Sequence, residues 1–205
     1  MSTPAYPVRL VEGQDLERSR LTVFFRLFLL IPHVIVLWLY GIAAGVVVII
    51  AWFAGVFTGR IPDGLHDFIV GYLRYSTRVT AYGTILADPF PPFGAGGSYA
   101  VDLEIDAPVT QSRLTIFFRT ILVIPCYVLV AYALQPLLGL IAIGNWFVAL
   151  FTGRVPEGLQ RLGLFCLRFN TRTLAYFFLV NPRYPAFGDT PASLPANQRA
   201  LPPLP

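Results

Sequence analysis

Residues 27–59 read LFLLIPHVIVLWLYGIAAGVVVIIAWFAGVFTG and contain no Asp, Glu, Arg or Lys. A second stretch of this kind, residues 120–153, reads TILVIPCYVLVAYALQPLLGLIAIGNWFVALFTG. An apolar run of about 18 or more uncharged residues is a candidate for crossing a membrane, and a buried core helix does not need such a run twice. The two stretches therefore predict an integral membrane protein.

The composition of the whole chain agrees with a membrane location. Hydrophobic residues make up 56% of the chain and charged residues 13%, whereas soluble proteins carry about 25% charged residues. Every basic residue is Arg, which excludes lysine chemistry such as a Schiff base. With abundant Ala, Gly and Pro, this usage suggests a bacterial source. The sequence contains no dense run of Arg residues of the kind that would indicate nucleic-acid binding.

The chain contains an internal duplication. SRLTVFFR at 19–26 returns as SRLTIFFR at 112–119, FTGRIPDGL at 57–65 returns as FTGRVPEGL at 151–159, and LRYSTR at 73–78 returns as LRFNTR at 167–172. We assign residues 1–94 to a first repeat and residues 95–188 to a second. The Pro- and Ala-rich tail, residues 189–205, is predicted to be disordered.

Each repeat opens with a short alternating segment that predicts a strand. In the first repeat Tyr6, Val8 and Leu10 alternate with Pro7 and Arg9. In the second, Tyr99, Val101, Leu103 and Ile105 follow the same period of two. Isolated strands are marginal, so we expect these two to pair with each other or with the chain near Asp88 and Asn181.

The apolar stretch of each repeat is too long for one upright span and short for two. One span needs about 20 residues and two need about 40, and Leu21 to Phe57 is 37 residues. We expect a helical hairpin with its turn near Tyr40-Gly41, and Pro136 as the break in the second repeat. An alternative is an interfacial helix that breaks at Pro32 and continues as one tilted span.

A second helix follows the apolar stretch in each repeat. Gly59 and Gly153 are predicted C-caps, and Pro62 and Pro156 are typical of a first helical turn. The helices are expected over 62–86 and 156–180. Helical spacing places Asp67, Arg74 and Arg78 on one stripe, and Arg161, Arg168 and Arg172 on the equivalent stripe. Each helix is therefore amphipathic, with a narrow basic face.

These blocks resemble a bacterial membrane family catalogued as domain of unknown function 4389. The resemblance rests on the Ser-Arg-Leu start, the Ile-Pro-His triplet at 31–33, the Thr-Gly-Arg-x-Pro-x-Gly-Leu turn, the Leu-Arg-x-x-Thr-Arg helix and the Pro-Pro-Phe close. The second repeat departs from the pattern, because Cys126 stands at the His position. The resemblance covers most of the chain in two tandem copies and implies a membrane location, but it supplies no activity.

The strongest candidate site is a set of arginines and threonines shared by both repeats. Arg forks match phosphate oxygens, and Thr hydroxyls can add hydrogen bonds, so we expect a surface for anionic lipid headgroups in each repeat. The alternative is plain anchoring of Arg at the membrane edge. The candidate residues are Arg60, Arg74, Thr77, Arg78, Arg154, Arg168, Thr171 and Arg172.

Other polar residues point to structural roles. His33 and His66 correspond to Cys126 and Gln160, so neither histidine belongs to a duplicated site. No spacing of ligands indicates a metal, no motif indicates a cofactor, and no catalytic set is predicted. Cys126 and Cys166 lie in apolar surroundings, which favours packing over a disulfide.

Together these features predict a mainly α, polytopic helical membrane protein of two parallel pseudo-repeats, which face the membrane in the same direction. Each repeat comprises a short strand, an apolar hairpin and an amphipathic Arg-bearing helix. Residues 1–20 lack a signal-peptide core, so the first apolar segment is expected to act as an uncleaved anchor. We expect a multi-pass protein of the bacterial cytoplasmic membrane with both termini in the cytoplasm.

The predicted function is a non-enzymatic scaffold or accessory subunit. Its expected contacts are anionic membrane lipids, a membrane partner complex or further copies of itself, and no nucleic acid. The alternative is a small transporter or lipid-handling protein with a site between the two repeats. An enzyme is disfavoured because neither repeat supplies a paired acid and base.

Overall fold

The computed structural model describes residues 6–13 and 15–186. The predicted disordered tail, 189–205, lies outside the described residues. The elements in chain order are β1 (Val8–Glu12), α1 (Arg20–Thr58), α2 (Asp63–Gly83), β2 (Val101–Ile105), α3 (Arg113–Leu122), α4 (Ile124–Leu129), the π-helix η1 (Val130–Leu134), α5 (Gln135–Thr152) and α6 (Glu157–Phe177).

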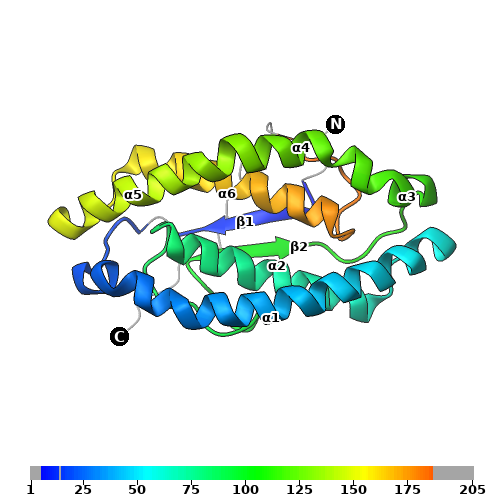
Figure 1. The fold of residues 1–205 in the computed structure, drawn as a ribbon, viewed down its shortest axis with the longest axis horizontal. Helices are drawn as coiled ribbons and strands as arrows, with labels where there is room; N and C mark the ends of the chain where they lie inside the picture. Colours follow the sequence, from blue (N-terminus) through cyan, green and yellow to red (C-terminus); the bar gives the residue numbers. More distant parts are fainter. Residues whose placement is uncertain (1–5, 14, 187–205) are drawn as a thin grey trace, which may run out of the picture.

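Two long helices frame the molecule. The first is α1, and the second is the run from α3 to α5, residues 113–152 (Figure 1). They extend along opposite sides and converge at both ends, while α2, α6 and the strands lie between them. The indole Nε1 of Trp52 donates to the Ile116 carbonyl at 3.1 Å, and that of Trp146 donates to the Val23 carbonyl at 3.2 Å. The two long helices therefore run in opposite directions.

The expected hairpin is absent, since α1 is one helix of 39 residues. Tyr40 does not mark a turn; its hydroxyl donates to the Phe68 carbonyl at 3.3 Å, and its ring packs on Phe68 and Tyr72 of α2. The alternative break at Pro32 is also absent, because Pro32 lies inside α1. A proline removes one helical hydrogen bond, which packing along the whole helix can offset.

One narrow stripe of α1 faces the protein along its full length. The buried residues of this stripe are Val23, Arg26, His33, Ala44, Ala51 and Gly55. The second long helix buries Ile116, Arg119, Cys126, Leu138, Asn145 and Ala149 in the same pattern. A spacing of three and four residues keeps one face of a helix in contact with its neighbours. The remaining faces of both long helices stay uncovered within the described residues.

The π-helix η1 accommodates one additional residue in the second repeat. Pro32 and Pro125 are 93 positions apart, whereas Trp52 and Trp146 are 94 apart. The additional residue falls between these landmarks, where Val130–Leu134 forms a π-helix. A π-bulge is the usual way for a helix to absorb a single inserted residue. The buried stripe consequently keeps its direction on both sides of the insertion.

The strands show that the two repeats are related by a pseudo-two-fold axis. β1 and β2 pair in antiparallel register with Leu10 opposite Leu103, which are equivalent residues of the two repeats. The pairing of Val8 with Ile105 is mirrored by that of Glu12 with Val101. Of the two pairings expected for the strands, pairing with each other is confirmed. An axis between Leu10 and Leu103 also accounts for the opposed long helices.

The glycine caps predicted after each long helix are confirmed, whereas the prolines lie just outside the helical turn predicted for them. Gly59 and Gly153 are C-caps with φ of 75° and 72°, a left-handed conformation that favours glycine. Pro62 and Pro156 precede α2 and α6 as N-caps rather than occupying the first turn. Both helices end a few residues earlier than expected, at Gly83 and Phe177.

Both long helices have the length and the apolar composition needed to cross a membrane. The most apolar windows of α1 and of residues 113–152 have mean hydropathies of 2.7 and 2.1, and few residues of these windows are buried. A core helix of a soluble protein would bury most of such a window. The length and composition of these two helices therefore support association with a membrane.

The π-helix leads to a deletion test. Removing the exposed Tyr132 restores the repeat offset of 93, so we expect η1 to become α-helical and the protein to stay folded. Removing Leu39 from α1, which has no π-helix, rotates its C-terminal half by about 100° and turns Ala44, Ala51 and Gly55 out of the core. Thermal unfolding in detergent should retain a cooperative transition for the first deletion and lose it for the second. Equal tolerance of both deletions would contradict this account of η1.

Candidate functional site

The predicted basic stripe of α2 is directed at the strand of the other repeat. Arg74 donates from Nε and Nη2 to the two carboxylate oxygens of Asp102 at 2.8 and 2.5 Å. Arg78 donates from the same atoms to the same oxygens at 2.9 and 2.8 Å. One carboxylate in β2 therefore accepts two bidentate arginines, which is a strong hydrogen-bonding geometry.

Arg78 is fully buried, and its donors are occupied by the protein. Besides Asp102, its Nη1 and Nη2 donate to the carbonyls of Gly96 and Gly97, each at 2.6 Å. The neighbouring Thr77 hydroxyl donates to the Leu73 carbonyl of its own helix at 2.7 Å. The Thr77 hydroxyl and four of the five N–H groups of Arg78 thus donate within the protein. Their contacts hold α2 and the 96–97 loop against β2.

The second repeat uses the same positions in a similar way. Arg168 is ion-paired with Glu12 at the end of β1. Arg172 donates to the Ala186 carbonyl at 2.9 Å, and its guanidinium lies over the ring of Tyr6 at 4.3 Å. The Thr171 hydroxyl donates to the Leu167 carbonyl at 2.8 Å. Each basic stripe thus binds the strand of the opposite repeat.

Burial and hydrogen bonding act against each other on Asp102. Burial pushes the pKa of its carboxyl upward, but hydrogen bonds from Arg74 and Arg78 outweigh it and hold the pKa below the ordinary value. The same hydrogen bond to Asp102 raises the pKa of Arg74. Asp102 is therefore ionised in the folded protein at neutral pH, and the cluster consists of two cations around one anion.

Arg60 and Arg154 differ from the other candidate arginines because they are exposed. Arg60 forms an exposed ion pair with Asp63. Gly59 lies beside the side chain of Arg113, and Gly153 lies beside that of Arg20, both of which are also exposed. These four exposed arginines therefore lie in two groups, which we call the exposed arginine pairs: Arg60 and Arg113 at one end of the long helices, and Arg20 and Arg154 at the other.

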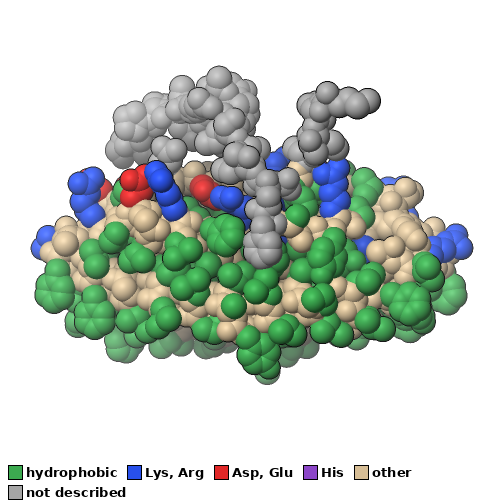
Figure 2. Space-filling view, turned by 90° about the horizontal axis from the view of Figure 1, so that it is seen from above, with side chains coloured by type: hydrophobic (Ala, Val, Ile, Leu, Met, Phe, Trp, Pro, Cys, Tyr) green, Lys and Arg blue, Asp and Glu red, His purple; other side chains and the backbone are tan. Residues whose placement is uncertain are grey.

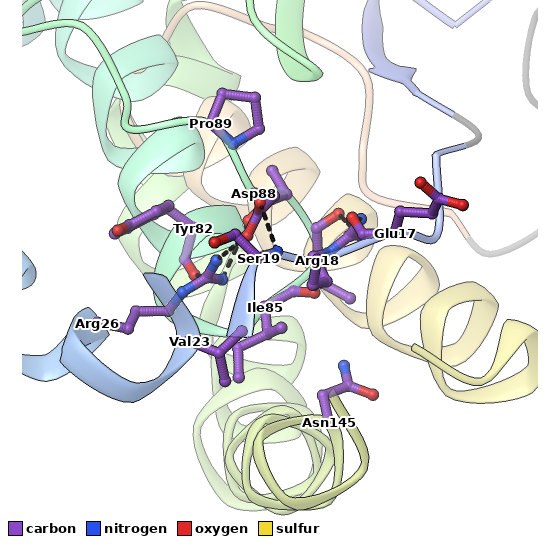
Figure 3. A network of polar contacts seen from close by, with 12 residues as sticks. Glu17, Arg18, Ser19, Val23, Arg26, Tyr82, Ile85, Asp88, Pro89 and Asn145 are labelled. Carbon is purple, nitrogen blue, oxygen red and sulfur yellow. Dashed lines mark hydrogen bonds and ion pairs between the residues drawn. The ribbon is translucent and has the colours of Figure 1, made fainter. Parts of the chain in front are cut away.

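The most deeply buried arginines of the long helices are not among the predicted site residues. Arg26 and Arg119 are 2% and 1% exposed and occupy equivalent positions. Arg26 donates to the carbonyls of Tyr82 and Ala87 at 2.7 and 3.1 Å, close to the end of α2 (Figure 3). Arg119 donates to those of Tyr176 and Asn181 at 3.2 and 3.0 Å. A charged residue inside an apolar segment is a functional candidate in itself, and this signal could have identified them.

The two buried arginines differ in their acidic partner. Nη2 of Arg26 donates to Asp88 at 2.7 Å, and the other Asp88 oxygen accepts from the Ser19 backbone at 3.0 Å (Figure 3). Nη2 of Arg119 donates instead to the amide oxygen of Gln111 at 2.7 Å. Among the described residues no carboxylate forms an ion pair with Arg119.

The histidines lie apart from these clusters. The Nδ1 atom of His33 is 2.8 Å from the Tyr75 hydroxyl, and its ring packs between Phe90 and Phe93. His66 is buried in α2 beside the exposed Asp67. Within residues 6–13 and 15–186, no group of three His, Cys, Asp or Glu side chains could hold a metal ion. Cys126 and Cys166 are buried and are not joined to each other.

The chain belongs to the family described as domain of unknown function (DUF4389). The family pattern matches twice in tandem, at residues 20–95 and 113–188. This finding confirms the resemblance and the duplication inferred from the repeated blocks. No curated protein and no solved structure matches the chain.

The arginine cluster generates a stability prediction. Replacing Asp102 with Asn leaves the buried charge of Arg78 uncompensated, so the free energy of unfolding should fall by about 3–5 kcal/mol. Asp106→Asn, which removes an exposed partner of Arg9, should cost at most about 1 kcal/mol. Because the folded-state pKa of Asp102 is depressed, its stabilisation is present above the unfolded-state pKa of about 3.9 and is lost as the pH falls through the folded-state value. Denaturation at several pH values should show a smaller acid loss in Asp102→Asn than in the wild type, because other ion pairs such as Arg26–Asp88 remain in the variant.

Proposed function

We propose that this DUF4389 protein is a non-enzymatic membrane scaffold whose long helices lie in the plane of the bilayer. In this arrangement the apolar side of α1 and of residues 113–152 enters one leaflet, and the strand side stays in water. The observation that supports it most directly is the separation of side chains in Figure 2. Apolar side chains cover the lower part of the molecule, and charged ones gather along the upper edge over its whole length.

The uncovered faces of the long helices are almost continuously apolar. On α1 large exposed hydrophobic residues extend from Leu21 to Phe57, and on the second helix they extend from Leu114 to Phe151. A soluble monomer rarely exposes a contiguous apolar patch of more than a few hundred Å². A surface that follows two helices of 39 and 40 residues needs an apolar medium, and a lipid leaflet provides one.

The position of the charged strands favours long helices that lie parallel to the membrane plane. Arg9, Asp102 and Glu104 belong to strands that run alongside the long helices (Figure 1). An upright α1 would carry these charged strands to the depth of the hydrocarbon, where each charge costs several kcal/mol. Laying the long helices parallel to the membrane keeps the strands in water along their entire length.

The length of α1 leads to the same conclusion. A helix of 39 residues is about 57 Å long, while the hydrocarbon core is about 30 Å thick. If α1 crossed the membrane with all its apolar residues in the hydrocarbon core, it would have to tilt from the membrane normal by roughly 55–60°. Spanning helices usually tilt by about 0–40°. The proposal therefore replaces the expected multi-pass topology with insertion from one side.

The exposed arginine pairs supply a contact with anionic lipid. Arg20 with Arg154, and Arg60 with Arg113, lie at the two ends of the long helices, and basic side chains mark both ends in Figure 2. Arginine at the edge of an apolar surface reaches headgroup phosphates while its stem stays in the apolar layer. The phosphate-binding hypothesis is thus retained for Arg60 and Arg154.

The pseudo-two-fold axis fits a membrane role for both repeats at once. With the axis along the membrane normal, the repeats face the membrane in the same direction, as expected for parallel repeats. The described ends of the chain also lie together, since the Tyr6 hydroxyl donates to the Arg183 carbonyl at 3.1 Å. We place both termini on the cytoplasmic side, with the strand side available to a partner complex.

The lipid-handling alternative is favoured by one observation. A half-open pocket of about 260 Å³ lies between α1 of the first repeat and α3 and the end of α6 of the second. A site between the repeats is what this alternative requires.

A depth profile along α1 tests the flat orientation. Phe28, Leu39, Val46 and Phe57 point away from the buried stripe and span about 44 Å. Spin labels at single cysteines in these positions, with Cys126 and Cys166 replaced by Ala, should report depths that agree within about 5 Å, one helical turn. Deep labels at Leu39 and Val46 with water-exposed labels at Phe28 and Phe57 would instead indicate a crossing helix and refute the proposal.

A second experiment tests the arginine pairs. Each Arg near an anionic surface contributes about 1 kcal/mol, so Arg60→Gln with Arg154→Gln should lower the enrichment of phosphatidylglycerol around the protein by about tenfold or more. Enrichment is measured by mass spectrometry of lipids retained from mixed phosphatidylglycerol and phosphatidylcholine bilayers. Arg161→Gln is the control, because Arg161, like Arg60, is exposed and has an acidic partner nearby in sequence, but it belongs to α6 and not to an end of the long helices. If the double variant retains as much phosphatidylglycerol as the wild type, Arg60 and Arg154 only anchor the protein at the membrane edge and do not bind phosphate.

A further inference from the structure

The uncovered apolar surface of the molecule is confined to one side. On α1, Leu27, Leu39 and Phe57 are each more than half exposed, and so are Leu140 and Phe151 on the second long helix. In Figure 2 apolar side chains cover the lower part of the molecule, and the charged ones lie along the opposite edge. The protein therefore has one side suited to hydrocarbon and one suited to water.

The depth of this apolar side matches a single leaflet. An α-helix with its side chains is about 10–12 Å wide, and the hydrocarbon of one leaflet is about 15 Å deep, half of the bilayer core. The strands limit deeper insertion, because Arg9 forms ion pairs with Glu104 and Asp106 that are costly to bring into hydrocarbon. A layer of two flat helices consequently ends before it reaches the opposite leaflet.

The inserted helices expand one leaflet and leave the other unchanged. The two long helices comprise 39 and 40 residues. At a rise of 1.5 Å per residue and a width of about 10 Å, the pair displaces roughly 1,200 Å² of lipid from the leaflet that it enters. A bilayer relieves such a difference in area by curving outward on the expanded side, which is why amphipathic helices are sensitive to curvature.

The two long helices are joined at both ends, which makes the inserted layer stiff along its length. The indole of Trp52 donates to the Ile116 carbonyl near one end, and that of Trp146 donates to the Val23 carbonyl near the other. The two buried arginines fix each long helix to the end of α2 or α6. Because packed protein interiors have low compressibility, this layer resists bending along its axis, and the membrane curves across it.

We infer that the protein bends membranes: its two long helices expand one leaflet and draw the bilayer outward into a tubule, with the helices along the tubule axis. The inference rests on the flat orientation proposed above and adds a mechanical activity to the scaffold. The partner is the hydrocarbon of a single leaflet. Anionic headgroups assist recruitment through the exposed arginine pairs, but the bending itself does not require them.

The test adds the full chain to the outside of giant vesicles that carry a fluorescent lipid. The protein is diluted from detergent to below the micelle concentration, so that it inserts from one side, and a fluorescent label reports the amount bound. We expect tubules that point outward and increase with bound protein, while detergent alone leaves the vesicles round. At equal bound protein, vesicles of phosphatidylcholine alone should form tubules like those that also contain phosphatidylglycerol.

Two variants at the same positions connect the bending to the inserted bulk. Phe28, Phe57 and Phe151 are among the most exposed aromatic residues of the long helices. Replacing all three with Ala narrows the inserted layer, since each phenyl ring is a large apolar group, and should shift tubule formation to a higher amount of bound protein. Replacing all three with Leu retains most of the bulk and should leave the threshold near that of the wild type. Thermal unfolding in detergent checks that both variants are folded.

The depth profile along α1, recorded in vesicles of the same composition, separates the two proposals. Round vesicles or inward tubules, together with a flat profile, would overturn the bending activity and leave the flat orientation in place. A profile of a crossing helix would overturn both. Equal thresholds for the Ala and Leu variants would show that inserted bulk is not the cause of the bending. If the Ala variant does not fold, the presence and direction of the wild-type tubules decide.

Discussion

Each long helix of this protein buries one arginine against the carbonyl groups that follow the shorter helix of the same repeat. Arg26 and Arg119 are among its most completely buried large side chains. Such a charge is tolerated only where donors meet acceptors in a fixed geometry, because an unpaired charge in an apolar interior costs several kcal/mol. The contact therefore fixes the long helix relative to the end of α2 or α6, and the uncovered apolar face is determined as a consequence.

The strands join the two repeats into one unit. β2 is held by Arg74 and Arg78 of α2, and β1 is held by Arg168 of α6, so each repeat supplies the acid for the other repeat's arginines. The indole of each repeat also donates to the long helix of the other. A single repeat would leave the buried Arg78 without its carboxylate, so the two repeats depend on each other for stability.

The pseudo-symmetry is informative where it fails. Most shared residues form the frame: the glycine caps, the stacked tyrosines, the buried arginines and the arginines of α2 and α6. Around the buried arginine contact the repeats differ at two positions, because Gln111 and Pro182 replace Arg18 and Asp88, so one positive and one negative charge are lost together. Within a duplicated fold, a basic stripe alone does not indicate a ligand, since the stripe can be satisfied by the protein itself.

Periodicity and length in the sequence correctly predicted the duplication, the strands, the glycine caps and the apolar character of the long helices. Each of these depends on neighbours within a few residues, or on comparison of the two copies. The single π-helix is also implicit in the change of offset from 93 to 94 between Pro125 and Trp146. The sequence wrongly suggested a hairpin where α1 is one continuous helix. The glycines and prolines inside α1 are compatible with a turn or with a packed helix, and only contacts along its length select the helix.

What the sequence alone determined is therefore local: which segments are helical, which are extended and which are apolar. The tertiary structure decided the roles of the charges. The acids that bind Arg74, Arg78 and Arg168 lie on strands of the opposite repeat, so a pattern that suits lipid phosphates proved to be internal. Spacing along a helix specifies which side chains share a face, but the partner of that face depends on how distant segments fold together.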